Sequence, residues 1–114
     1  MHDFKIIAKE VLELEAKELL NAAALIGDEM REATELVASL KGKLIITGVG
    51  KSGLIGAKIA ATLASTGTSS FFLHPTEALH GDLGMIGKDD AVLAISYSGE
   101  SEELIKILPH IKRF

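Results

Sequence analysis

From Lys43 onward the chain alternates short apolar runs with helix-like segments. This alternation restricts the possible folds more than any other feature of the sequence. Apolar runs predict strands at residues 44–47, 69–73 and 91–95. Apolar residues at helical spacing predict helices at residues 54–64 and 102–111. Strands separated by helices are typical of a parallel, doubly wound sheet. We therefore expect an α/β protein, built as a three-layer αβα sandwich.

The first part of the chain shows no such alternation. Residues 4–26 form one helical pattern with a broad apolar face, Gly27 interrupts it, and a second helical pattern covers residues 28–40. These helices carry no recognisable chemistry, so we expect them to serve packing or dimerisation. We accordingly expect a helical segment at residues 1–41 and a sheet domain at residues 42–114.

A hydroxyl-rich turn, Ser96-Tyr97-Ser98-Gly99-Glu100-Ser101, joins the third predicted strand to the last predicted helix. Its serines offer hydroxyl groups, and the helix that follows offers free backbone N–H groups at its amino end. Both kinds of donor bind anions, so the turn predicts a site for a small phosphorylated molecule. Serine also caps helices in many proteins, and capping alone explains the same residues.

A glycine-rich loop, Gly48-Val49-Gly50-Lys51-Ser52-Gly53, follows the first predicted strand. A Walker A interpretation fails, because Ile45 stands where that motif requires its first glycine. A dinucleotide site is disfavoured, because Leu73-His74-Pro75 stands where the ribose-binding acid is expected. The glycines instead let the backbone approach a ligand closely, while Lys51 and Ser52 offer a positive charge and a hydrogen-bond donor.

Loops that follow neighbouring parallel strands meet at one edge of the sheet. We therefore expect the Lys51 loop and the turn at residues 96–101 to face one crevice that holds a phosphorylated metabolite. Three strands also make a thin sheet, and the strongly apolar third strand would lie at its edge. For this reason we expect the 114 residues to be the front part of a longer domain.

Composition excludes several classes of function. A formal net charge of -4 leaves no basic surface for nucleic acid, and no apolar run approaches the roughly 20 residues that span a bilayer. With no cysteine, the chain has no disulfide, zinc–thiolate site or thiol nucleophile. We expect a cytoplasmic protein without a resident metal, because His74, His80 and Asp82 in an irregular segment are weak evidence for ligands.

The segment His74–Ile86 contains a further block, His80-Gly81-Asp82-Leu83-Gly84. Together with the blocks Gly50–Gly53 and Ser98–Ser101, it resembles the sugar isomerase (SIS) domain family over about residues 40–114. Within that family the chain is most similar to the D-arabinose 5-phosphate isomerases. The resemblance implies a five-stranded parallel sheet of flavodoxin-like order 2-1-3-4-5, with further strands and tandem CBS domains beyond this chain.

The resemblance also implies a function. It implies interconversion of D-ribulose 5-phosphate and D-arabinose 5-phosphate, the first step toward the octulosonate sugar of lipopolysaccharide. It implies no organic cofactor and a homodimer or homotetramer. Residues implied as phosphate ligands are Ser52, Ser96, Ser98 and Ser101. Residues implied as candidates for catalytic work on the sugar are Lys51, His80 and Glu103. Close backbone approach is expected at Gly48, Gly50, Gly53 and Gly99.

Aldose–ketose isomerisation removes a proton beside a carbonyl and returns it to the neighbouring carbon. It needs a base, which contributes about 10²–10⁴-fold, and a donor to the oxygen that becomes charged. Glu103 is a candidate base, although acids in the first turn of a helix also complement its dipole. Two alternatives stay open: a non-catalytic SIS domain that senses a sugar phosphate, and an isomerase of another phosphosugar.

Overall fold

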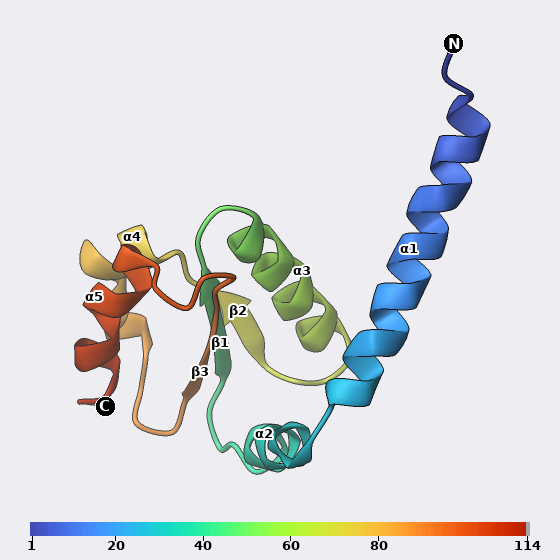
Figure 1. Ribbon diagram of the computed structural model, residues 1–114. Helices are drawn as coiled ribbons and strands as arrows, with labels where there is room; N and C mark the ends of the chain where they lie inside the picture. The colour runs from blue at the N-terminus through green and yellow to red at the C-terminus, as the bar shows by residue number, and fades with distance from the viewer. Residues whose placement is uncertain (114) are drawn as a thin grey trace. The chain divides into compact units, whose positions relative to one another are not determined.

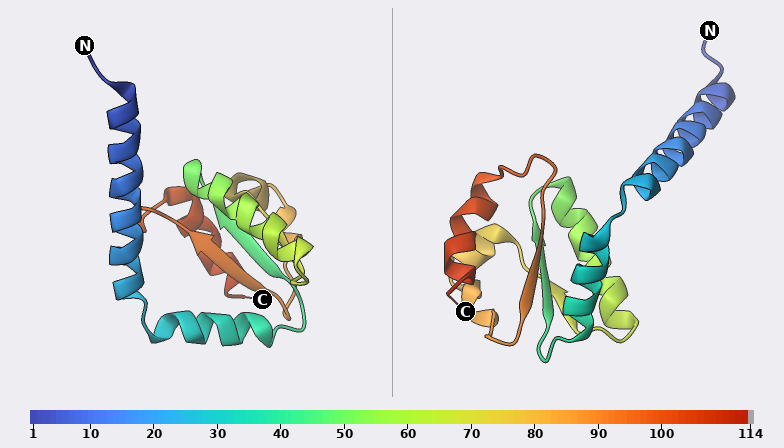
Figure 2. Two further views of the ribbon diagram at one scale, coloured as in Figure 1. Left: turned by 90° about the vertical axis from the view of Figure 1, so that its right-hand side faces the viewer. Right: turned by 60° about the horizontal axis from the view of Figure 1, so that its bottom comes forward.

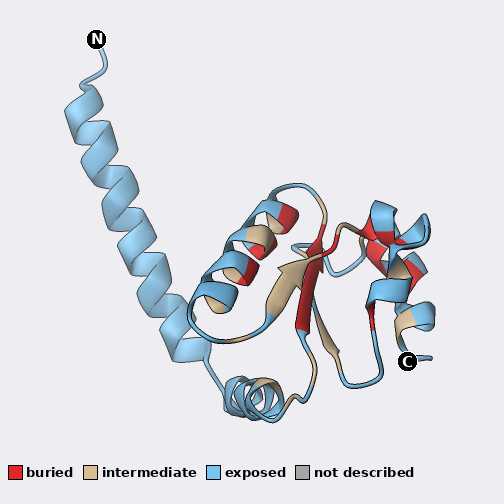
Figure 3. Ribbon diagram, turned by 180° about the vertical axis from the view of Figure 1, so that it is seen from behind, coloured by how far each residue is buried: buried red, intermediate tan, exposed pale blue. Residues whose placement is uncertain are grey.

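The structure, a computed structural model, describes residues 1–113. The chain forms two compact units, Met1–Leu36 and Val37–Phe114. The first contains α1 (Phe4–Leu25) and most of α2 (Asp28–Ala38), and both helices are close to the predicted ones. No residue of either helix is buried, so the apolar side chains of α1 are exposed (Figure 3).

Three parallel strands form the sheet of the second unit (Figure 1). β1 (Leu44–Gly48) lies in the centre, with β2 (Ser70–Phe72) on one side and β3 (Ala91–Ile95) on the other. Gly48 is in register with Ile95, so β1 and β3 end side by side. The predicted α/β class is confirmed, and the order 2-1-3 agrees with the first three strands of the expected sheet.

Helices cover both faces of this sheet (Figures 1 and 2). α3 (Lys51–Ser65) lies on one face, and α4 (Pro75–Leu79) and α5 (Glu102–Ile111) lie on the other. A short 3-10 helix, η1 (Asp82–Met85), follows α4. The helix at 102–111 is as predicted, whereas α3 begins three residues before its predicted start. The segment 75–90 holds more helix than the single turn expected, because its two helices are too short to show periodicity.

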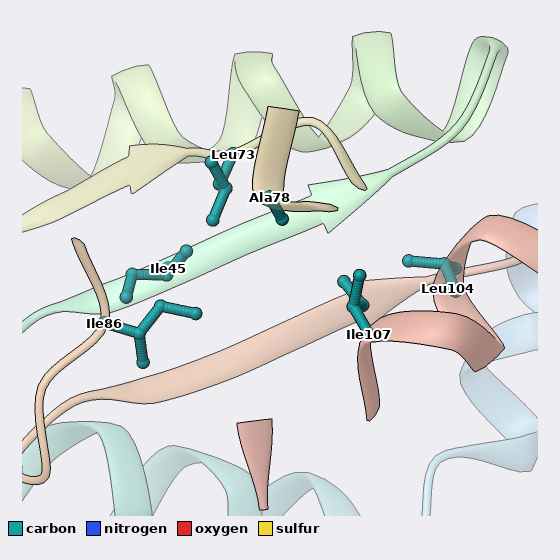
Figure 4. Packing of buried hydrophobic residues seen from close by; sticks show 6 residues of the cluster. All are labelled: Ile45, Leu73, Ala78, Ile86, Leu104 and Ile107. Atoms are coloured by element: carbon teal, nitrogen blue, oxygen red, sulfur yellow. The ribbon is translucent and has the colours of Figure 1, made fainter. Parts of the chain in front are cut away.

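Side-chain alternation along β1 divides the core into two clusters, because successive residues of a strand point to opposite faces. Ile45 points toward α4 and α5. The buried cluster on that face consists of Ile45, Leu73, Ala78, Ile86, Leu104 and Ile107 (Figure 4). Leu44 and Ile46 point the other way and pack with Ala60 of α3. Both layers of helices are therefore attached to β1, which fixes the amino ends of α3 and α5 relative to the sheet.

The two outer strands are less buried than β1, whose five residues are all buried. The sequence predicted β3 as a buried strand, but Leu93 keeps 42% of its surface exposed. This part of the prediction was wrong, because β3 pairs with β1 along one edge and with no other strand of residues 1–113.

Candidate functional site

The connection from β1 to α3 turns sharply at Gly50. This residue has φ +61° and ψ −131°, a conformation that favours glycine because it has no Cβ. The turn lets α3 begin directly at Lys51, which explains the early start of the helix. The backbone N–H of Leu54 donates to the Gly50 carbonyl at 3.1 Å and closes the first turn. Ser52 is thereby fixed in the first turn of α3, at the carboxyl end of β1.

Two further glycines allow this turn to lie against the end of the strand. A Cβ on Gly53 would lie 2.7 Å from the Gly48 carbonyl oxygen, which is backbone and does not move independently. A Cβ on Gly48 would lie 3.0 Å from the carbonyl oxygen of Ile95. The glycines of the loop therefore serve close packing of α3, β1 and β3 as well as the turn itself.

The serine-rich turn after β3 is organised by its own hydroxyl groups. Ser96 Oγ accepts a hydrogen bond from the backbone N–H of Gly99 at 2.9 Å. Ser98 Oγ accepts one from the N–H of Glu100 at 3.1 Å. Gly99 supplies the positive φ, +73°, that the turn requires. Because both hydroxyls act as acceptors here, their own hydrogen atoms stay available to donate to a ligand.

The two loops share one hollow of about 290 Å³ at the carboxyl end of the sheet. The residues that line it are Val49, Ser52, Ile95, Ser96, Tyr97, Ser98, Ser101 and Leu104. The four serines named from the sequence thus converge on a single space, although they come from two connections. Sequence reasoning did not identify four lining residues, Val49, Ile95, Tyr97 and Leu104. Val49 and Tyr97 lie in the two connections, whereas Ile95 ends β3 and Leu104 lies in the first turn of α5.

None of the three candidate catalytic residues, Lys51, His80 and Glu103, lines this hollow. Lys51 is exposed at the start of α3, directly before Ser52. His80 is exposed at the carboxyl end of α4, where its backbone N–H donates to carbonyl oxygens of that helix. The structure therefore brings the serines together and leaves these two side chains on the surrounding surface.

Glu103 lies in the first turn of α5 and has a partner from the hollow. Ser101 Oγ donates to Glu103 Oε2 at 3.1 Å. The backbone N–H of Glu103 itself and the Ser101 hydroxyl hold the pKa of this carboxyl below its usual value. The positive charge of Lys106 and the nearby His74 act in the same direction. The ionised form of Glu103, the form that a general base needs, is therefore favoured.

His74 follows β2. From the sequence it was weighed only as a metal ligand, on weak evidence. Its Nδ1 accepts a hydrogen bond from the N–H of Thr76 at 3.1 Å, and its ring meets the Phe72 ring edge-on at 6.5 Å. In the neutral ring this bond places the proton on Nε2. Within residues 1–113, no group of three or more acidic, His or Cys side chains could hold a metal ion. None of the helices in the described range could cross a membrane.

Comparison with known proteins places this site in a family. Residues 37–114 match the family model described as SIS domain. The chain belongs to the SIS domain family. The match begins where the second unit begins and includes both connections that form the hollow. The family resemblance carried by the glycine, histidine and serine blocks is thus confirmed.

Curated relatives are identical to the chain at about half of the aligned residues. An arabinose 5-phosphate isomerase of Pseudomonas aeruginosa is 53% identical over 111 residues, which is 97% of this chain and 34% of that protein. One from Yersinia pestis is 50% identical over 111 residues, again 97% and 34%. The chain spans about a third of the length of these relatives.

A solved structure shares the fold across nearly the whole chain. The c3406 protein of E. coli CFT073, solved in complex with arabinose 5-phosphate, superposes with a TM-score of 0.91. It is 44% identical and covers 99% of this chain and 61% of its own. The same arrangement of strands and helices therefore occurs in a protein that was solved with this sugar phosphate.

Proposed function

We propose that this chain binds a pentose phosphate and takes part in interconverting D-ribulose 5-phosphate and D-arabinose 5-phosphate. The observation that carries this proposal is the hollow at the end of the sheet, where serines from two separate connections converge. The relatives named arabinose 5-phosphate isomerase, and the neighbour solved with arabinose 5-phosphate, support the choice of sugar. No organic cofactor is part of the proposal.

The phosphate group is held, in this proposal, by Ser52, Ser96, Ser98 and Ser101. The amino ends of α3 and α5 add backbone donors, because neither Gly50 nor Ser101 caps its helix with a side chain. Such donors favour a dianion over a neutral hydroxyl group. Gly48, Gly50, Gly53 and Gly99 let these backbone groups come close to the ligand. Holding the phosphate fixes one end of the substrate and so orients the reacting carbons.

The reaction then needs only proton transfers. We propose that the Glu103 carboxylate takes a proton from C1 of the ketose, and the C–H electron pair forms a double bond between C1 and C2. The electron pair of the C2 carbonyl moves to its oxygen and gives an enediolate. The ammonium group of Lys51 stabilises that oxygen. Glu103 returns its proton to C2 and the O1 proton passes to O2, which yields the aldose and restores the carboxylate. His80 contacts the sugar hydroxyls.

The proposal includes the organisation expected from the sequence. We propose the division expected from the sequence, with a helical segment at residues 1–41 followed by the sugar-phosphate domain. The active form is a homodimer or homotetramer in the cytoplasm.

The experiment incubates the chain with D-ribulose 5-phosphate and follows the anomeric proton of D-arabinose 5-phosphate by NMR. The proposal predicts that this signal grows with time, and that Glu103→Gln lowers the rate by about 10² or more while the phosphate still binds. Binding without conversion would contradict it and support a sugar-phosphate sensor instead. Conversion of a hexulose or heptose phosphate, but not of ribulose 5-phosphate, would show that the sugar has been assigned wrongly.

A further inference from the structure

Ser101 occupies the residue directly before α5, where serine normally caps a helix. Its side chain makes no such capping hydrogen bond. The hydroxyl group donates instead to Glu103 Oε2 at 3.1 Å, and the residue also lines the hollow between the two loops. Ser101 therefore lies between the proposed phosphate position and the proposed base.

Glu103 uses the donors that a phosphate in the hollow would need. Its carboxylate interacts with its own backbone N–H, in the first turn of α5, and with the Ser101 hydroxyl. A serine hydroxyl has one hydrogen atom and cannot donate fully to two oxygen atoms at once. A phosphate that accepts the Ser101 hydrogen bond therefore replaces Glu103 as its acceptor.

We propose that Ser101 is a positioning residue that couples phosphate binding to release of the Glu103 carboxylate. In the free chain the Ser101 hydroxyl donates to Glu103, and in the complex it donates to the bound phosphate. This inference rests on the proposed function and adds a step to it. The substrate's own phosphate group prepares the base that acts on the other end of the same molecule.

The exchange changes the basicity of Glu103 in a definite direction. Hydrogen bonds to an ionised carboxylate lower its pKa, so loss of the Ser101 hydrogen bond raises it. The negative charge of the phosphate raises it further. The electrostatic influence of Lys106 of α5 and of His74, directly before α4, lowers the pKa of Glu103 and so opposes this rise. A carboxylate with a raised pKa accepts a proton from carbon more readily.

The test titrates Glu103 by carbon-13 NMR in the chain carrying labelled glutamate, with the signal assigned from its loss in Glu103→Gln. Inorganic sulfate is the probe, because it stays fully ionised as the pH falls from neutral. The proposal predicts that sulfate raises the midpoint in the wild-type chain. In Ser101→Ala the midpoint is already higher without sulfate, and sulfate raises it less.

Two further variants separate coupling from damage to the fold. Ser101→Thr keeps a hydroxyl group and should restore the wild-type response to sulfate. Ser98→Ala removes a different hydroxyl from the hollow and should leave the midpoint of the free chain unchanged, because Ser98 bonds to Glu100 and not to Glu103. Amide spectra of each variant report that it is folded.

An unchanged midpoint in Ser101→Ala, or a sulfate-induced rise equal to that of the wild type, would overturn the inference. Conversion of ribulose 5-phosphate is measured separately on the same samples. Conversion without the coupled rise removes the inference and leaves the proposed function intact. A coupled rise without conversion supports the hydrogen-bond exchange and removes the proposed reaction.

Discussion

Replacing Gly53 by alanine tests how closely α3 must approach β1. The new Cβ would lie 2.7 Å from the Gly48 carbonyl oxygen and 3.3 Å from Phe72 Cζ, whereas ordinary contacts begin at 3.4 Å. The first turn of α3 must therefore move by about 0.7 Å or the end of β1 must bend. Overpacking of this kind costs about 1–3 kcal/mol, and the higher helix propensity of alanine returns at most about 1 kcal/mol.

The net expectation for Gly53→Ala is a loss of about 1–2 kcal/mol in the free energy of unfolding, measured by urea titration. The displaced turn carries Ser52, so the affinity for arabinose 5-phosphate should fall as well. Gly84→Ala is the matched control, because its Cβ would meet nothing within 4 Å, and it should stay within about 0.5 kcal/mol of the wild type. A Gly53→Ala chain as stable as the wild type would refute the packing argument.

Three further predictions address the site and the sheet edge. Ser98→Ala should weaken binding of arabinose 5-phosphate by about tenfold in calorimetry, because one hydrogen bond to a charged group is lost. The same variant should bind unphosphorylated arabinose as the wild type does. Equal losses of affinity for both sugars would contradict a phosphate role. Lys51→Ala should lower kcat while the urea midpoint stays within experimental error, because an exposed lysine contributes little to folding; an equally large loss of stability would argue for a structural role. Asp90 accepts backbone N–H bonds from Lys43 at 2.6 Å and Gly87 at 2.7 Å, and these lower its pKa. Its stabilising contribution is therefore present above the unfolded-state pKa near 3.8 and is lost as the pH falls through the lower folded-state pKa. Asp90→Asn should have a lower free energy of unfolding than the wild type at neutral pH. A stability difference between the two that persists unchanged in strong acid would contradict this.

The sheet could be predicted from the sequence because β1 is buried on both faces. Its uninterrupted apolar run, Leu44 to Ile46, follows directly from that position. The inference from apolar composition to burial failed for β3. Its apolar residues predict a buried strand, but within residues 1–113 no second strand pairs with β3 to cover its outer edge. An apolar run reports what a strand can bury, and its neighbours decide how much of it is buried.

The start of α3 was misplaced because glycine has two uses that look identical in a sequence. Gly50 makes a turn at positive φ, whereas Gly53 lies inside the helix and permits close packing against Gly48. From the spacing of the glycines in the sequence we predicted both Gly50 and Gly53 as loop residues. The distinction depends on what surrounds each Cα, which only the folded chain determines.

Convergence of the two connections could be predicted because it depends on topology alone: parallel neighbours end at the same edge of a sheet. The hydrogen bond from Ser101 to Glu103 could not be predicted, because it depends on a side-chain rotamer that competes with ordinary helix capping. The hydrogen bond from Thr76 to His74 likewise depends on a side-chain rotamer. Topology therefore predicted where the site lies, and local rotamers determine how its groups are paired.

We propose that the connections after β1 and β3 hold one phosphate group between them. A crystal structure of the chain soaked with D-arabinose 5-phosphate tests this arrangement. We expect phosphorus density in the hollow, within hydrogen-bond reach of both the Ser52 and the Ser98 hydroxyl groups. Phosphate bound elsewhere, or bound to one connection while the other stays in solvent, would contradict it.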